Sequence, residues 1–182
     1  MTFEKTVTLK DGRNCLLRNG VTSDGKAVLD VFNRTHEETD YLLTYSDENR
    51  FTASQEADFL QRKTDSANNV EIIAVVDDVV AGTAGIDALG LRDKIKHRAV
   101  FGIAITKEFW GLGIGKYLME ACIECAREAG YLQLELEVVA ENERAVEMYR
   151  RAGFIEYGRN PKGFRLRTGE YQELIDMRLE LK

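Results

Sequence analysis

The sequence predicts a single α+β domain built on a mostly antiparallel sheet. Tight turn signals join neighbouring apolar segments in the first half, as at Asp77-Asp78 between residues 70–76 and 79–86. One strand–helix–strand unit follows over residues 98–139. The 182 residues fall within the size range of one domain and can bury one core. We therefore expect one domain over residues 1–182, with about seven strands in a mixed sheet and about four helices.

The first elements predicted are a hairpin and two helices. Apolar residues in the stretch 6–18 flank Asp11-Gly12, a favoured two-residue hairpin turn. Apolar spacing predicts a helix over about residues 22–35, followed by a loop or broken helix from His36 to Arg50. Thr52 and Gln55 resemble a capping box that begins a second helix.

The second half alternates between strands and helices. A strand at 98–105 leads through a glycine-rich turn into a helix that ends near Gly130. Leucines alternate with polar residues over 131–139, as in a half-buried strand. Asn142 is a good N-cap for the next helix, and Gly153 is a good stop. A short strand, a polar loop around Pro161 and a last strand from about Tyr171 to Leu181 complete the expected order.

The charge balance excludes some classes of function. Lys and Arg total 25 against 31 Asp and Glu, a net charge of −6, which argues against a general nucleic-acid binder. No apolar run is long enough to span a membrane, and the N-terminus lacks a secretory apolar stretch. Three cysteines fit a reducing compartment, so we expect a cytoplasmic protein. Helical spacing puts Cys122 and Cys125 on an apolar face, which favours core packing over a metal or redox site.

The informative motif is the turn Gly111-x-Gly113-x-Gly115 between a strand and a helix. Glycines let a backbone pass close to a ligand, and the N–H groups at a helix start favour anions such as a pyrophosphate. The alternative is a turn needed only for close packing of the helix on the strand. The G-x-G-x-x-G spacing of dinucleotide-binding folds is not met, and no Gly-Lys-Ser/Thr follows as in a P-loop.

Four motifs in a fixed order make the pattern specific. They are V-F-G-I-A-I-T (100–106), W-G-L-G-I-G-K (110–116), L-E-L-E-V-V-A-E-N (134–142) and A-V-E-M-Y-R-R-A-G-F (145–154). In this order and spacing they resemble the GCN5-related N-acetyltransferase (GNAT) superfamily. The segment L-E-V-x-x-x-N is similar to the ribosomal-protein alanine N-acetyltransferases. Trp110 is a departure, because family members commonly have Arg or Gln there.

The resemblance implies the GNAT fold, acetyl-CoA as the donor and no metal. It implies that the turn binds the pyrophosphate through backbone N–H groups, that the preceding strand binds the pantetheine arm and thioester, and that the start of the fourth helix contacts the coenzyme. The coenzyme-binding residues it implies are Ile103, Ala104, Ile105, Gly111, Leu112, Gly113, Ile114, Gly115, Lys116, Asn142 and Tyr149. Asn142 has an equal interpretation as a helix N-cap.

Acyl transfer to an amine needs a proton acceptor, since an alkylammonium has a pKa of about 10. The resemblance makes Glu137 the candidate base, through a water, and Tyr149 the candidate acid to the departing sulfur. Glu137 also fits a solvated strand carboxylate, and Tyr149 also fits the apolar face of its helix.

The acceptor site is expected near residues 36–41. Glu38 and Asp40 there have carboxylates for a cationic amine, and Tyr41 has a ring to pack on it, although an acidic surface loop would look the same. Val139 and Glu141 depart from the alanine-acetylating subgroup, so the acceptor stays open among small amines, polyamines and peptide or protein amines. The function expected is direct acetyl transfer to a primary amine, and the alternative is a non-catalytic acyl-CoA-binding regulatory module. The resemblance also allows a homodimer.

Overall fold

The structure is a computed structural model that describes residues 1–181. This part of the chain contains eight strands and four α-helices, one strand more than expected. The strands are β1 (Glu4–Thr8), β2 (Asn14–Asn19), β3 (Val70–Val76), β4 (Val79–Ala88), β5 (Arg98–Ile105), β6 (Gln133–Val139), β7 (Ile155–Arg165) and β8 (Tyr171–Glu180). The helices are α1 (Gly25–Glu38), α2 (Ala53–Asp65), α3 (Ile114–Glu128) and α4 (Glu143–Arg151), with short 3-10 turns η1 (Thr22–Asp24), η2 (Ser46–Glu48) and η3 (Lys107–Phe109).

All eight strands form one mixed sheet in the order β1-β2-β3-β4-β5-β6-β8-β7. Every neighbouring pair is antiparallel except β5 and β6, which are parallel. The α+β class with a mostly antiparallel sheet is therefore confirmed. The parallel pair is the strand–helix–strand unit expected from the sequence, because α3 connects its two strands.

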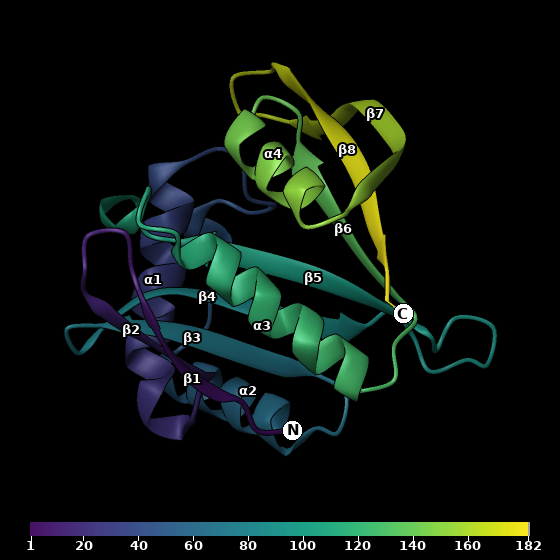
Figure 1. Cartoon of the computed structure of the whole chain (residues 1–182). Coiled ribbons are helices and arrows are strands. Elements are labelled where there is room, and N and C mark those ends of the chain that lie inside the picture. Colours follow the sequence, from purple (N-terminus) through teal and green to yellow (C-terminus); the bar gives the residue numbers. More distant parts are fainter. Residues whose placement is uncertain (182) are drawn as a thin grey trace.

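The helices cover both faces of the sheet because side chains alternate along each strand. On β3, Ile73 packs with Val28 of α1 and Leu60 of α2. Its neighbours Ile72 and Ala74 belong to the larger core, which includes Leu118 and Cys122 of α3. Figure 1 shows α3 in front of the sheet with α1 and α2 behind it.

The parallel pair is short. Strands β5 and β6 pair only from Arg98 to Val100 against Gln133 to Glu135, whereas β4 and β5 pair along seven residues. Beyond these three positions the two strands diverge, and Figure 1 shows β6, β7, β8 and α4 turning away from β1–β5. Within residues 1–181 the second half of β5 therefore has no paired strand on its β6 side.

Two local expectations need correction. Helix α1 continues to Glu38, three residues beyond its expected end, where the His36 ring stacks on Phe32 at 3.9 Å. The polar segment around Pro161 is part of β7 and not a separate loop. It bulges from the strand, because residues 160–164 of β7 lie opposite only residues 172–174 of β8. A bulge accommodates a proline, which has no N–H for the ladder.

Candidate active site

The glycine turn and the start of α3 form an anion-receptive surface. Gly111 and Gly113 have φ values of +89° and +96°, which side-chain-bearing residues rarely adopt. Gly113 is the N-cap of α3 and has no side chain to accept a hydrogen bond. The N–H groups of the first turn therefore have no partner within the helix and point outward. The predicted pyrophosphate-binding residues 111–116 therefore lie together, and backbone N–H groups at the start of α3 are available to donate to an anion.

Gly115 has a different role from the other two glycines. A Cβ at this position would lie 3.0 Å from the Met148 Sδ and 3.4 Å from the Ile105 Cδ1. Gly115 thus allows α3 to pack closely on α4 and β5. Both interpretations of the glycine motif, ligand approach and close packing, therefore hold at different positions of the same turn.

Positive side chains surround the turn, and two of them were missed from the sequence. The Lys10 side chain passes beside the turn, since a Cβ on Gly113 would lie 4.0 Å from the Lys10 Cε, and the Lys10 backbone N–H donates to the Leu112 carbonyl at 3.2 Å. The Arg144 guanidinium lies 5.9 Å from the centroid of the Trp110 ring and close to Gly111. Lys116, which was predicted, is exposed near Glu120. In the sequence, the only indication that Arg144 lies near the turn is its place two residues after Asn142. Nothing in the sequence indicates that Lys10 lies there.

The free edge of β5 leads away from this turn. The Thr106 N–H donates to the Ala81 carbonyl of the adjacent chain segment at 3.0 Å. Since backbone groups alternate along a strand, Ala104 directs its N–H and C=O toward β4, and Ile103 and Ile105 direct theirs toward the divergent side. Ile103 and Ile105 are therefore placed as expected for backbone contacts with a ligand, whereas the backbone of Ala104 pairs with β4 at Thr83.

Trp110 occupies part of that edge. Its indole N–H donates to the Ile105 carbonyl at 2.7 Å. The ring lies between the Lys107 ammonium, 6.0 Å from its centroid, and the Arg144 guanidinium. Trp110 thus connects the glycine turn to the end of β5 through a side-chain hydrogen bond.

Tyr149 is buried beside the free edge. It lies on α4 with 6% of its surface exposed, and its ring centroid is 6.1 Å from that of Phe101 and 5.8 Å from that of Phe154. Burial raises the pKa of its phenol above the ordinary value of 10.0, so the side chain stays neutral and can donate a proton. Asn142 caps α4, because its Oδ1 accepts from the Ala145 N–H at 3.3 Å.

Glu137 lies on the opposite face of the sheet from Tyr149. Leu136 and Val138 pack in the core with Tyr149, so the side chain between them points the other way and is exposed. It lies opposite Asp176 of β8. Glu135 on the same face accepts hydrogen bonds from the Nε and Nη2 of Arg98 and forms an ion pair with that guanidinium. The structure therefore does not bring Glu137 and Tyr149 into contact.

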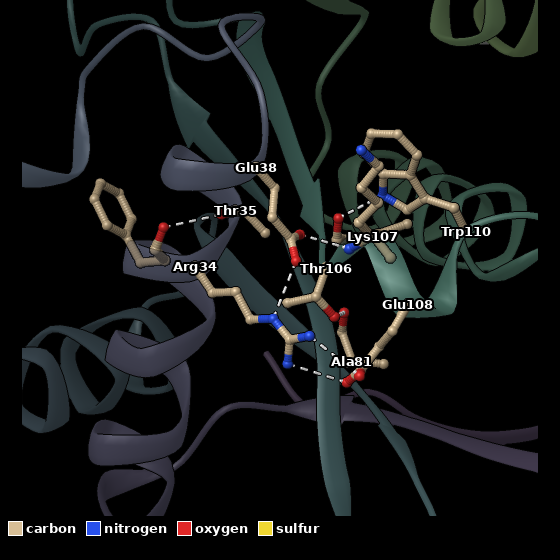
Figure 2. Close-up of polar contacts among 10 residues, drawn as sticks. Arg34, Thr35, Glu38, Ala81, Thr106, Lys107, Glu108 and Trp110 are labelled. Atoms are coloured by element: carbon tan, nitrogen blue, oxygen red, sulfur yellow. Dashed lines mark hydrogen bonds and ion pairs between the residues drawn. The ribbon is translucent and has the colours of Figure 1, made fainter.

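A cleft of about 810 Å³ contains the three predicted acceptor-binding residues, Glu38, Asp40 and Tyr41. It lies where the loop after α1, the start of η3 and the β7–β8 turn meet, and its wall includes Trp110. Glu137 is not part of this wall. Figure 2 shows the Glu38 carboxylate between Arg34 and Lys107. It accepts from the Lys107 N–H at 2.6 Å and pairs with Arg34 at 3.0 Å, so its oxygens are already engaged.

The cysteines pack in the core as expected. Cys15, Cys122 and Cys125 are free and buried, and burial raises the pKa of Cys15 to about 11 and that of Cys125 to about 12. Protonated buried thiols are poor nucleophiles and metal ligands. Among residues 1–181 no three His, Cys, Asp or Glu side chains are grouped to hold a metal ion. No helix in the described part of the chain is long and apolar enough to cross a membrane.

Comparison with known proteins agrees with this arrangement. Residues 30–154 match the Acetyltransferase (GNAT) family. The chain is 31% identical over 118 residues to an L-amino acid N-acetyltransferase of Escherichia coli strain K12, a match that covers 64% of this chain and 72% of that protein.

Two solved structures are similar over nearly the whole chain. A GNAT-family acetyltransferase from Streptococcus pneumoniae superimposes with a TM-score of 0.87 at 28% identity, over 91% of this chain and 99% of the other. A Salmonella typhimurium structure with its cofactor acetyl-CoA superimposes with a TM-score of 0.82 at 16% identity, over 93% and 95%. The family match, which spans more than half of the chain, and the fold together show that this protein belongs to the GNAT family of acetyltransferases.

Proposed function

We propose that the protein transfers an acetyl group from acetyl-CoA directly to a primary amine. One observation carries the proposal: Trp110 belongs to both the anion-receptive turn and the wall of the acidic cleft. A donor held by its pyrophosphate at the turn and extended along the free edge of β5 would therefore end beside the cleft. The similarity to an L-amino acid N-acetyltransferase and to a structure that contains acetyl-CoA supports this donor and this class of reaction.

The residues fit such a donor. The uncapped N–H groups of α3, with Lys10, Lys116 and Arg144 nearby, match a pyrophosphate carried by an acidic protein. Within residues 1–181 the backbone of Ile103 has no strand partner on the divergent side and can hydrogen-bond an extended arm, whereas the Ile105 carbonyl is already bonded to Trp110. The coenzyme supplies the acetyl group as a thioester.

The proton balance assigns Tyr149 a role. The amine loses one proton, its nitrogen forms the amide bond, and the carbon–sulfur bond breaks. The departing thiolate needs a proton, which a neutral buried phenol can donate and then recover from the proton that the amine released. Neither Glu137 nor Tyr149 lines the cleft, so either residue would exchange a proton with the acceptor amine only through intervening water.

Two assays test the proposal. Incubation with acetyl-CoA and a panel of amines, amino acids, peptides and polyamines should release free thiol at a rate that depends on the amine. Calorimetry should show binding of acetyl-CoA and CoA but not of NAD. Coenzyme binding without turnover of any amine would instead support a regulatory acyl-CoA-binding module, and tight binding of NAD would contradict both functions.

A further inference from the structure

Negatively charged side chains outnumber positively charged ones on the wall of the acceptor cleft. Its carboxylates are Glu38, Asp40, Glu141 and Glu170, and its cationic side chain is Lys107. Glu38 is already bonded to Arg34 and to the Lys107 N–H. It therefore contributes little to binding a ligand, although the sequence suggested it as a contact.

The other three carboxylates are available. Asp40 follows α1, Glu141 lies in the turn between β6 and α4, and Glu170 lies in the turn between β7 and β8. None of the three has an ion-pair partner within residues 1–181, and the one side-chain hydrogen bond among them runs from the Thr168 hydroxyl to Glu170. Two nearby arginines are engaged elsewhere, Arg34 with Glu38 and Glu108, and Arg167 with Asp47. The cations that lie over the wall rings, Arg144 at Trp110 and Lys162 and Arg165 at Tyr171, do not line the cleft.

A buried amide in the same wall also lacks a partner. Gln172 is 9% exposed, and its Oε1 is buried without a hydrogen bond to any described residue. An unpaired buried polar atom costs free energy that a ligand can recover. Gln172 lines the cleft together with the free carboxylates, so a rotation of its side chain toward the cleft would let a ligand supply the missing N–H.

Aromatic rings complete the wall. Tyr41, Trp110 and Tyr171 line the cleft, each with between 36% and 49% of its surface exposed. Such rings pack against methylene groups and against cations. The cleft therefore combines apolar surface for an alkyl chain with carboxylates on several sides.

We propose, on the basis of the proposed function, that the acceptor is a small aliphatic diamine or polyamine. The amine that attacks must be neutral, so it does not need three carboxylates. A second ammonium group keeps its charge throughout and can bind Asp40, Glu141 or Glu170 while an N–H bonds to Gln172. An acceptor with a free carboxylate is disfavoured, because like charges in one cleft repel. This distinguishes the chain from its L-amino acid-acetylating relative.

Three acceptors of the same chain length test the charge requirement: 1,4-diaminobutane, n-butylamine and 4-aminobutanoate. Thiol release with acetyl-CoA should give a kcat/KM for the diamine roughly tenfold or more above that of the monoamine, with the amino acid lowest. Calorimetry with the CoA-bound protein should show the same order of affinity. Added salt should reduce the diamine preference, since partly exposed charges are screened.

Three substitutions locate the second charge. At least one of Asp40→Asn, Glu141→Gln and Glu170→Gln should lower the ratio of diamine to monoamine kcat/KM about tenfold, whereas Asp58→Asn on the exposed side of α2 should leave that ratio unchanged. An unchanged ratio in all three variants would overturn the inference.

The outcomes separate the two proposals. Equal kcat/KM values for diamine and monoamine, or a higher value for the amino acid or for a peptide amine, would overturn the diamine inference and leave acetyl transfer standing. Diamine binding by calorimetry without thiol release would overturn acetyl transfer and uphold the site. Neither binding nor turnover of the diamine would overturn the inference.

Discussion

At the scale of single residues, burial determines what Tyr149 can do. The ring packs against Phe101 and Phe154, and only 6% of the residue is exposed. A phenol in such surroundings is held neutral because the charged form would lose its solvation. Core packing and proton donation are therefore compatible roles for the same side chain.

The substitution Tyr149→Phe tests the proton-donating role. It removes only the hydroxyl, so kcat should fall roughly 10- to 100-fold while the Kd for acetyl-CoA stays within about twofold. Because the pKa of Tyr149 is raised above 10.0, the wild-type rate should show no decline from this group as the pH rises to 10.0. Steady-state kinetics and calorimetry measure the two quantities.

The matched control is Tyr131→Phe, at a buried tyrosine beyond the other end of α3. It should change stability slightly and kcat hardly at all. An unchanged kcat in Tyr149→Phe would exclude this tyrosine as the acid.

At the scale of elements, the turn before α3 depends on backbone conformation more than on side chains. Gly113 caps the helix in a left-handed conformation, with φ at +96° and ψ at 0°. The first N–H groups of α3 then have no side-chain cap and remain available to an anion. Lys10 stabilises the turn from outside by donating to Leu112.

The substitution Gly113→Ala should strain this turn. A non-glycine residue in the left-handed region costs about 1–2 kcal/mol, and relief of that strain would rotate the N–H groups. We expect lower stability in urea and an affinity for acetyl-CoA that falls about tenfold. The Cβ itself would meet nothing closer than 3.8 Å, so the effect is conformational and not a clash.

Gly130→Ala is the control, since Gly130 has φ at +80° with open space around it and lies at the far end of α3. It should lose similar stability and keep coenzyme affinity. Equal loss of affinity in both variants would show that general destabilisation, and not the turn, is responsible.

At the scale of the whole molecule, two distant segments close one side of the acceptor cleft. Arg167 of the β7–β8 turn forms a double ion pair with Asp47 at 2.7 and 3.0 Å, and its guanidinium lies 4.1 Å from the centroid of the Tyr45 ring. Its backbone N–H donates to the Tyr45 hydroxyl at 3.0 Å. These contacts hold the loop after α1 against the second half of the sheet.

The substitution Arg167→Ala should loosen the cleft without affecting the donor site. An exposed ion pair and one cation–π contact contribute little stability, so Tm should change by only a few degrees. The KM for the acceptor should rise roughly three- to tenfold, and hydrogen exchange should increase in residues 39–50. Arg159→Ala, which removes contacts to Glu156 and Glu173 outside the cleft wall, is the control. An acceptor KM that is the same in wild type and Arg167→Ala would contradict this role.

The sequence by itself determined the element order and the coenzyme turn, because both are local. Alternating leucines define β6, Asn142 and Gly153 bound α4, and a glycine pattern between a strand and a helix places free N–H groups at one point. The spacing of these motifs was enough to predict the α+β sheet and the family. It missed the full length of α1, since no strong stop signal separates Thr35 from Glu38.

Only the tertiary structure decided how the remaining charges are used. Glu38 and Asp40 look equivalent in the sequence, but Arg34 and the Lys107 N–H engage Glu38, whereas Asp40 has no ion pair with any described residue. Glu141, Glu170 and Gln172 join Asp40 because β5 and β6 diverge and bring separate turns to one cleft. Lys10 and Arg144 reach the glycine turn in the same way. Such contacts depend on how elements pack across long sequence separations, which local patterns do not encode.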